Sequence, residues 1–141
     1  MRILSTALLL AVTGCASNIP ANMAGPAAIG AVDWAKATTV EVHLGDFHFH
    51  PETLRFNAGA PVALVLINTG GTEHKFVAPR FFAEAVIKPG QARPGVDGIT
   101  LKAGERTRID LAPTRPDTYG LECTEMLHSM LGMSGSIVVV P

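Results

Sequence analysis

The stretch Thr118–Val140, TYGLECTEMLHSMLGMSGSIVVV, decides both the fold and the chemistry of this chain. Its two ends, TYGLEC and SGSIVVV, are rich in residues that favour β-strands, so we expect two strands joined by a loop. The loop carries Cys123, His128 and Met133 in the spacing C-x4-H-x4-M, and a loop of this size can turn three side chains toward one point. A thiolate, an imidazole and a thioether form a soft ligand set, which favours copper over magnesium, calcium or manganese.

The loop alone does not complete a metal site. A structural zinc would need four firm ligands, usually including two or more cysteines. A blue-copper electron-transfer centre uses two histidines and one cysteine, with a weak axial methionine, so one histidine must come from elsewhere. The best candidate is His74 in LVLINTGGTEHKFVAP (Leu64–Pro79), because it follows an apolar strand and a Gly70-Gly71 turn. In a β-sandwich that position can lie at the same end as the Cys123–Met133 loop.

The rest of the chain alternates short apolar stretches with turn residues. Strands are expected in Ala37–Leu44 and on both sides of Asn57-Ala58-Gly59 within Glu52–Gly71. Gly98–Pro113 is expected to form a hairpin, and only Arg80–Pro89 favours a helical turn. Many short strands punctuated by Gly and Pro indicate an all-β protein, an antiparallel β-sandwich.

The N-terminus has the order of an export signal. MRILSTALLLAVTGC (Met1–Cys15) has one positive charge, a short apolar run and small residues before the cysteine. Its end resembles a bacterial lipobox, so residues 1–14 are expected to be a lipoprotein signal peptide and Cys15 to carry lipid. The alternatives are an ordinary cleaved signal or a buried N-terminal segment. With lipid on Cys15, Cys123 is the one remaining thiol and no intramolecular disulfide can form.

Residues 15–33 are rich in Ala, Gly, Pro and Asn and predict a flexible tether, with the folded domain at residues 34–141. Alternatively, the residues before Trp34 form a strand that packs partly on the domain. Ala16 and Ser17 carry no inner-membrane retention signal, which favours the outer membrane of a Gram-negative cell over the inner one. The formal net charge is −1 and no run of Lys or Arg is present, so nucleic acid is not an expected partner.

Two segments together resemble one known family. FHFHPETLRFNAGAPVALVLINTGGTEHKF (Phe47–Phe76) and the Thr118–Val140 stretch are similar to the cupredoxins, the small blue copper proteins. The resemblance covers roughly residues 40–141, and the ligand-loop spacing is similar to the rusticyanin branch. It implies a Greek-key β-sandwich with one type 1 copper at one end. Carried over by position, the copper ligands are His74, Cys123, His128 and axial Met133.

Some residues leave alternatives or depart from the family pattern. Met126 and Met130 compete for the axial position, although Gly132-Met133-Ser134-Gly135 matches the family's Gly-Met-x-Gly pattern. Lys75 stands where many cupredoxins have Asn or Ser to brace the ligand loop, and Met126-Leu127 stands where many have Pro-Gly. Neither change removes a ligand, but contacts around the ligands tune rigidity and reduction potential.

The segment DFHFHP (Asp46–Pro51) could hold a second metal. Strand alternation would turn Phe47 and Phe49 one way and the polar residues the other. His48 and His50 could then form an exposed copper or zinc site with Asp46, although surface histidines are the simpler interpretation. The resemblance to the cupredoxins, which often keep a Phe and a Pro here, implies that Phe49 is a core residue and Pro51 a turn residue.

The sequence therefore predicts a monomeric, lipid-anchored periplasmic protein that carries single electrons between redox proteins of the cell envelope. Four copper ligands leave no open position and no nucleophile–base pair is visible, so an enzyme is not expected. The alternative function is storage, delivery or tolerance of Cu(I). A third hypothesis is a cupredoxin-like domain with a role in the envelope to which its metal does not contribute.

Overall fold

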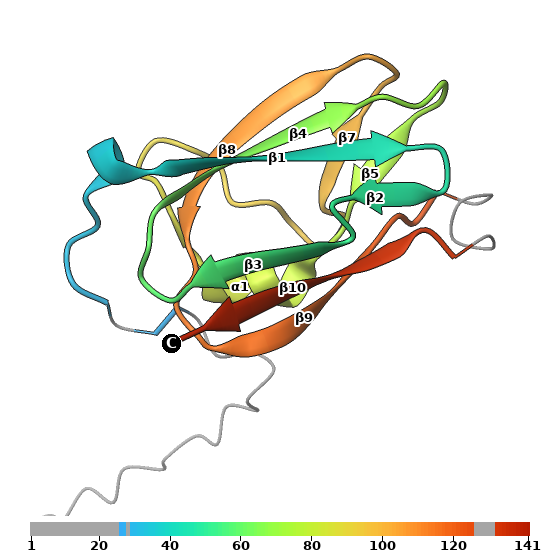
Figure 1. Cartoon of the computed structure of the whole chain (residues 1–141). Helices are drawn as coiled ribbons and strands as arrows, with labels where there is room; N and C mark the ends of the chain where they lie inside the picture. The colour runs from blue at the N-terminus through green and yellow to red at the C-terminus, as the bar shows by residue number, and fades with distance from the viewer. Residues whose placement is uncertain (1–25, 28, 126–131) are drawn as a thin grey trace, which may run out of the picture.

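The computed structural model describes residues 26, 27, 29–125 and 132–141. Their strands form a five-stranded sheet, a three-stranded sheet and a two-stranded ribbon (Figure 1). The first sheet has the order β2-β1-β4-β8-β6, from His48–His50, Thr38–Gly45, Val62–Asn68, Arg106–Ala112 and Val86–Ile87. The second has the order β3-β10-β9, from Thr53–Asn57, Ser134–Val140 and Asp117–Glu122. The ribbon pairs β5 (His74–Phe76) with β7 (Ile99–Leu101).

The prediction of an all-β sandwich is confirmed, with two differences in pairing. The sheets are mixed, because β1 lies parallel to β4 and β3 lies parallel to β10. The hairpin predicted in Gly98–Pro113 is wrong. Its turn exists, with Gly104 at φ +75°, but β7 pairs with β5 while β8 pairs with β4 and β6. The two strands that leave this turn therefore enter different sheets, as sandwich connections commonly do.

The core lies between the two sheets and is made of alternating inward side chains. Val42 and Leu44 of β1 face the interior, as do Leu54 and Phe56 of β3. β4 lies between β1 and β8 in its sheet and is buried along nearly its whole length. Burial of such apolar side chains is the main favourable contribution to folding.

Within the residues that the structure describes, two short helical elements accompany the sheets. The helix α1 (Pro79–Glu84) accounts for the expected helical turn, begins with Pro79 in its first turn and buries Phe81 and Phe82. A 3-10 turn, η2 (Trp34–Lys36), precedes β1 and is capped by the Asp33 carboxylate, which accepts from the amide of Ala35 at 3.2 Å. In the part of the chain that the structure describes, no helix is long and apolar enough to cross a membrane.

The Asp46–Pro51 segment differs from its predicted alternation. Asp46 and Phe47 form the turn between β1 and β2, since Gly45 pairs with His48. Phe47 has φ +69° and is 47% exposed, so the prediction that it faces the same way as Phe49 is wrong. A tight turn interrupts the period-2 pattern on which that prediction relied. Phe49 lies in the core as expected and contacts Phe76 edge to face, with ring centroids 5.9 Å apart.

The described end of the predicted tether contacts the domain. The amide of Ala27 donates to the Thr114 hydroxyl at 2.9 Å, and Ile29 and Val32 are half-buried beside Trp34. Figure 1 shows this N-terminal entry near the C-terminus, away from the β1–β2 turn. The chain thus enters the sandwich at the end opposite β5.

A buried polar network closes the Thr114 end of the sandwich. The Tyr119 hydroxyl donates to the buried Glu84 carboxylate at 2.7 Å, and the Arg80 guanidinium lies 4.6 Å from the centre of the Tyr119 ring. Tyr119 is only 3% exposed. Burial, and then the hydrogen bond to Glu84, raise the pKa of Tyr119 to about 12.

This network predicts a loss of stability in alkali. The native fold keeps Tyr119 neutral, so its contribution is present below about pH 10 and is lost between about pH 10 and pH 12. The loss in the free energy of unfolding would reach roughly 3 kcal/mol, at about 1.36 kcal/mol for each pKa unit. Tyr119 is the only tyrosine of the chain, so tyrosinate absorbance follows it directly. In urea unfolding at several alkaline pH values, Tyr119→Phe should lose most of this pH dependence; an equally steep loss in that variant would contradict the assignment.

Candidate metal centre

A bridge between β5 and β9 brings His74 and Cys123 to one place. Val77 and Glu122 exchange two backbone hydrogen bonds of 3.0 and 3.1 Å, which join the ribbon to the three-stranded sheet. Farther along the same bridge, the amide of Lys75 donates to Cys123 Sγ at 3.4 Å. Since Lys75 directly follows His74, the predicted imidazole and the thiol lie at the same end of the sandwich.

Met133 reaches this end through the start of β10. The amide of Cys123 donates to the carbonyl of Met133 at 3.1 Å, so the two residues face each other across the β9–β10 pair. Gly132 has φ +80°, which favours glycine, and Gly135 lies so close to Glu52 that a Cβ would be 2.5 Å from its carbonyl oxygen. The Gly-Met-x-Gly pattern therefore has a backbone reason at both glycines.

All three described candidate ligands are buried. His74 is 0% exposed and Cys123 and Met133 are each 1% exposed, while Cys123 is a thiol. Phe49, Phe76 and Leu101 lie in the same core cluster as Cys123 and Met133. An apolar surround of this kind limits solvent access to a bound metal and influences its reduction potential.

A carboxylate lies on the outer side of His74. His74 Nε2 is 3.4 Å from Asp46 Oδ1, and the amide of Gly71 donates to the same oxygen at 3.2 Å. The loop between them is held by buried Asn68, which donates to the carbonyls of Thr72 and Leu101 and accepts from the amide of Gly70. From the sequence, Asp46 was considered only as a possible ligand beside His48 and His50, and no local pattern points to its contact with a histidine 28 residues away.

Lys75 and Glu125 form an ion pair, with Nζ 2.8 Å from Oε1. It joins β5 to the segment that directly follows Cys123, where the family pattern led us to expect a loop without a brace. The hydrogen bond and charge of Glu125 raise the pKa of Lys75, as do the charges of Glu73 and Asp97. This ion pair could not be predicted from the sequence, because the proximity of Lys75 to Glu125 depends on the β5–β9 bridge.

The remaining predictions have different outcomes. His128, Met126 and Met130 lie outside the described residues, as does Cys15 with the signal peptide, so they stay predictions. Within the described ranges, no group of three His, Cys, Asp or Glu side chains is placed to hold a metal, which leaves the second site at His48 and His50 without support. His48 Nδ1 instead lies 3.1 Å from the backbone carbonyl of Asp46.

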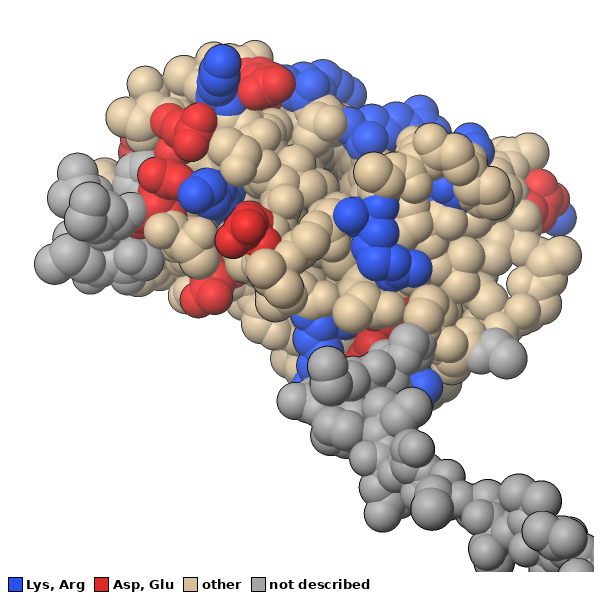
Figure 2. Space-filling model, turned by 180° about the vertical axis from the view of Figure 1, so that it is seen from behind, with Lys and Arg blue, Asp and Glu red and all other residues tan. Residues whose placement is uncertain are grey.

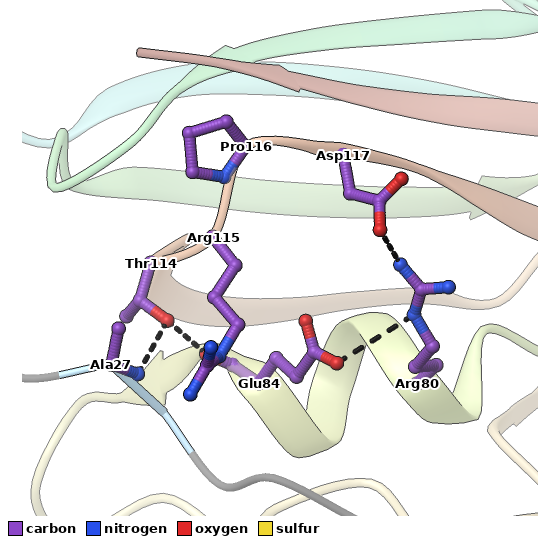
Figure 3. A pocket seen from close by; sticks show the side chains of 7 residues that line it. All are labelled: Ala27, Arg80, Glu84, Thr114, Arg115, Pro116 and Asp117. Carbon is purple, nitrogen blue, oxygen red and sulfur yellow. Dashed lines mark hydrogen bonds and ion pairs between the residues drawn. The ribbon is translucent and has the colours of Figure 1, made fainter. Parts of the chain in front are cut away.

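A cavity of about 670 Å³ lies at the Thr114 end of the sandwich (Figure 3). Arg80, Glu84, Thr114 and Asp117 line it, together with the residues Ala27, Arg115 and Pro116. Arg80 pairs with both Asp117 and Glu84, so the acidic groups of this cavity are matched within it. It is part of the network that closes the Thr114 end, and His74, Cys123 and Met133, the copper ligands that the structure describes, do not line it.

A β-sandwich with a buried cysteine, histidine and methionine at one end defines a cupredoxin-type protein. Residues 36–140 match the family described as copper binding proteins, plastocyanin/azurin family, and the chain belongs to that family. Copper is its cofactor, with one ion per chain. No curated protein matches the sequence significantly.

Solved structures agree on the fold. An auracyanin B structure has a TM-score of 0.56 at 23% identity, covering 86% of this chain and 100% of that one. A reduced auracyanin from Roseiflexus castenholzii has a TM-score of 0.54 at 19% identity, covering 74% and 99%. The McoA multicopper oxidase of Aquifex aeolicus gives 0.59 at 18% identity, covering 82% of this chain but only 32% of that one.

The contact at the thiol predicts that the backbone of Lys75 matters more than its side chain. Lys75→Ala keeps the amide that donates to Cys123 Sγ, whereas Lys75→Pro removes it. An amide donor stabilises a thiolate, so Lys75→Pro should shift the copper–thiolate absorption band and lower the reduction potential. Lys75→Ala should leave both near those of the unchanged protein, with circular dichroism confirming the fold of each variant. Equal effects of the two substitutions would contradict this role of the amide.

Proposed function

We propose that this protein is a type 1 copper protein that carries single electrons between redox proteins of the cell envelope. The observation that carries the proposal is the buried Cys123 thiol, which accepts the Lys75 amide beside buried His74 and Met133. These donor atoms fit copper: a soft thiol, an imidazole and a thioether in an apolar surround. His74, Cys123 and His128 would hold it, with the Met133 thioether as a further, weaker ligand.

Copper in such a site supplies a one-electron Cu(I)/Cu(II) couple. The contacts that position Cys123 and His74 are made within the protein, so we expect them to persist in both oxidation states. Cys123 is fixed on both sides, by the Lys75 amide at its sulfur and by its own amide on the Met133 carbonyl. His74 lies in β5, which is paired with β7 in a regular register. A fixed ligand set minimises rearrangement when an electron arrives or leaves.

Partners would bind at the metal end, the end of the sandwich that contains His74, Cys123 and Met133. We propose His128, with its apolar neighbours Leu127, Met130 and Leu131, as the contact point, although all four lie outside the described residues. Weak redox encounters use small interfaces of this kind. Glu73, Asp97 and Glu125 act on Lys75 at the same end, and Figure 2 shows acidic side chains gathered toward one end of the molecule. This charge favours a partner with a positive contact surface.

A role in catalysis is not proposed. Two His, one Cys and one Met fill the ligand set and leave no position for a substrate. The charged groups of the cavity at Thr114 are paired with each other and lie away from the site. A second candidate function, storage or delivery of Cu(I), is favoured only by Met126 and Met130 in the loop sequence.

The absorption spectrum of the full-length protein in detergent tests the electron-transfer proposal. One equivalent of Cu(II) should give an intense orange-red band, because a buried thiolate transfers charge to the metal. The band should disappear on reduction, return on oxidation, and be absent in Cys123→Ser. A colourless protein that binds more than one equivalent of Cu(I) would contradict the proposal and favour storage.

We further propose that lipid on Cys15 holds the protein at the periplasmic face of a membrane, with the outer membrane favoured. In a Gram-negative host the unchanged protein should fractionate with outer-membrane vesicles and label with a radioactive fatty acid. Cys15→Ser should abolish labelling and leave the copper band unchanged, because Cys15 is no part of the site. Equal labelling of both forms would contradict lipidation at this cysteine.

A further inference from the structure

We propose that Asp46 is a positioning residue that orients His74 for copper and favours the Cu(II) state. The proposal rests on the function above, since it takes His74 as a ligand. Asp46 Oδ1 lies 3.4 Å from His74 Nε2, within the range of an ion pair and long for a hydrogen bond. The two residues come from the β1–β2 turn and from β5, so the contact joins the first sheet to the ribbon.

The chemistry of the pair fixes which nitrogen is available to the metal. A carboxylate accepts hydrogen bonds and a neutral imidazole has one N–H, so an N–H directed at Asp46 must be on Nε2. The lone pair is then on Nδ1, which is buried in the interior. A ligating histidine commonly donates its other ring N–H to a carboxylate, which fixes the ring and makes it a stronger electron donor.

The backbone around the pair is built to allow this contact. A Cβ at Gly70 would lie 2.4 Å from His74 Nε2 and 2.5 Å from Asp46 Oδ1, so only glycine lets the two atoms approach. The Gly71 amide, donating to the same carboxylate oxygen at 3.2 Å, holds the carboxylate in place. Buried Asn68 fixes the Gly70 turn through its own amide and carbonyl groups. The missing side chain at Gly70, the Gly71 amide and the hydrogen bonds of Asn68 therefore all favour the same orientation of Asp46 toward His74.

The exposures of the two side chains keep the desolvation cost of this contact low. The Asp46 side chain is 52% exposed, so its charge keeps much of its hydration, whereas the His74 ring is fully buried. The negative charge acts on the buried site through the ring. A carboxylate there stabilises the more positive Cu(II) more than Cu(I), and its removal should raise the reduction potential.

The test compares Asp46→Asn with Asp97→Asn in the full-length copper protein. Each substitution removes one negative charge at the same end of the molecule. The Asp46 carboxylate contacts the His74 ring, whereas the charge of Asp97 acts on Lys75, so Asp97→Asn is the control for charge alone. A tenfold loss of Cu(II) binding relative to Cu(I) in Asp46→Asn would raise the potential by about 59 mV. Asp97→Asn should give a much smaller shift. Zn(II) affinity, which needs no redox couple, should fall by roughly tenfold to a hundredfold only in Asp46→Asn.

A second variant separates contact from charge. Gly70→Ala keeps the carboxylate but forces His74 Nε2 and Asp46 Oδ1 apart, so it should weaken Zn(II) binding and raise the potential as Asp46→Asn does. A shift equal in Asp46→Asn and Asp97→Asn would overturn the proposal, as would unchanged Zn(II) affinity in Asp46→Asn. Failure of the proposed function looks different, because the unchanged protein would then show neither a thiolate band nor a reversible couple.

Discussion

The site depends on the two-bond bridge between Val77 and Glu122. It joins a ribbon from the middle of the chain to a sheet that contains the C-terminus, and both bonds are of normal length. With this register fixed, the Lys75 amide meets the Cys123 sulfur and the Lys75 side chain meets Glu125. A shift by one residue would turn these side chains to the other face, because side chains alternate along a strand. One backbone pairing therefore determines the neighbours of the thiol.

Burying an imidazole at this position requires support from both sides. On the inner side, Phe76 continues from His74 into a row of rings through Phe82 and Phe81 to Tyr119, with neighbouring centroids 5.5 to 6.0 Å apart. This row links the metal end to the network at Glu84. On the outer side, Asp46 Oδ1 lies 3.4 Å from His74 Nε2, and Asn68 holds the Gly70 turn close to the ring. The row of aromatic rings supports the inner side of His74, and the polar turn orients its ring.

Much of this was predictable from local sequence. The β9–β10 pair and the strands around Asn57-Ala58-Gly59 follow from periodicity and turn residues, and both are confirmed. The core position of Phe49 followed from the family resemblance and is also confirmed. The prediction that failed concerns which strands pair with each other. The turn at Gly104 looks like a hairpin turn, yet its two strands pair elsewhere, because pairing in a sandwich is decided by burial of distant faces. The same limit hid Asp46 and Glu125, whose partners lie 28 and 50 residues away in sequence.

The departures from the family pattern acquire a physical meaning once the contacts are known. Lys75 cannot offer the short polar side chain expected after the first histidine, but its ion pair with Glu125 joins the same two segments. Such a pair is weaker in salt than a buried amide contact, because exposed charges are screened. The backbone amide of Lys75 is unaffected by salt and remains on the sulfur. Two contacts of Lys75 therefore join these segments: a backbone hydrogen bond to the thiol that salt does not screen, and a surface ion pair that salt weakens.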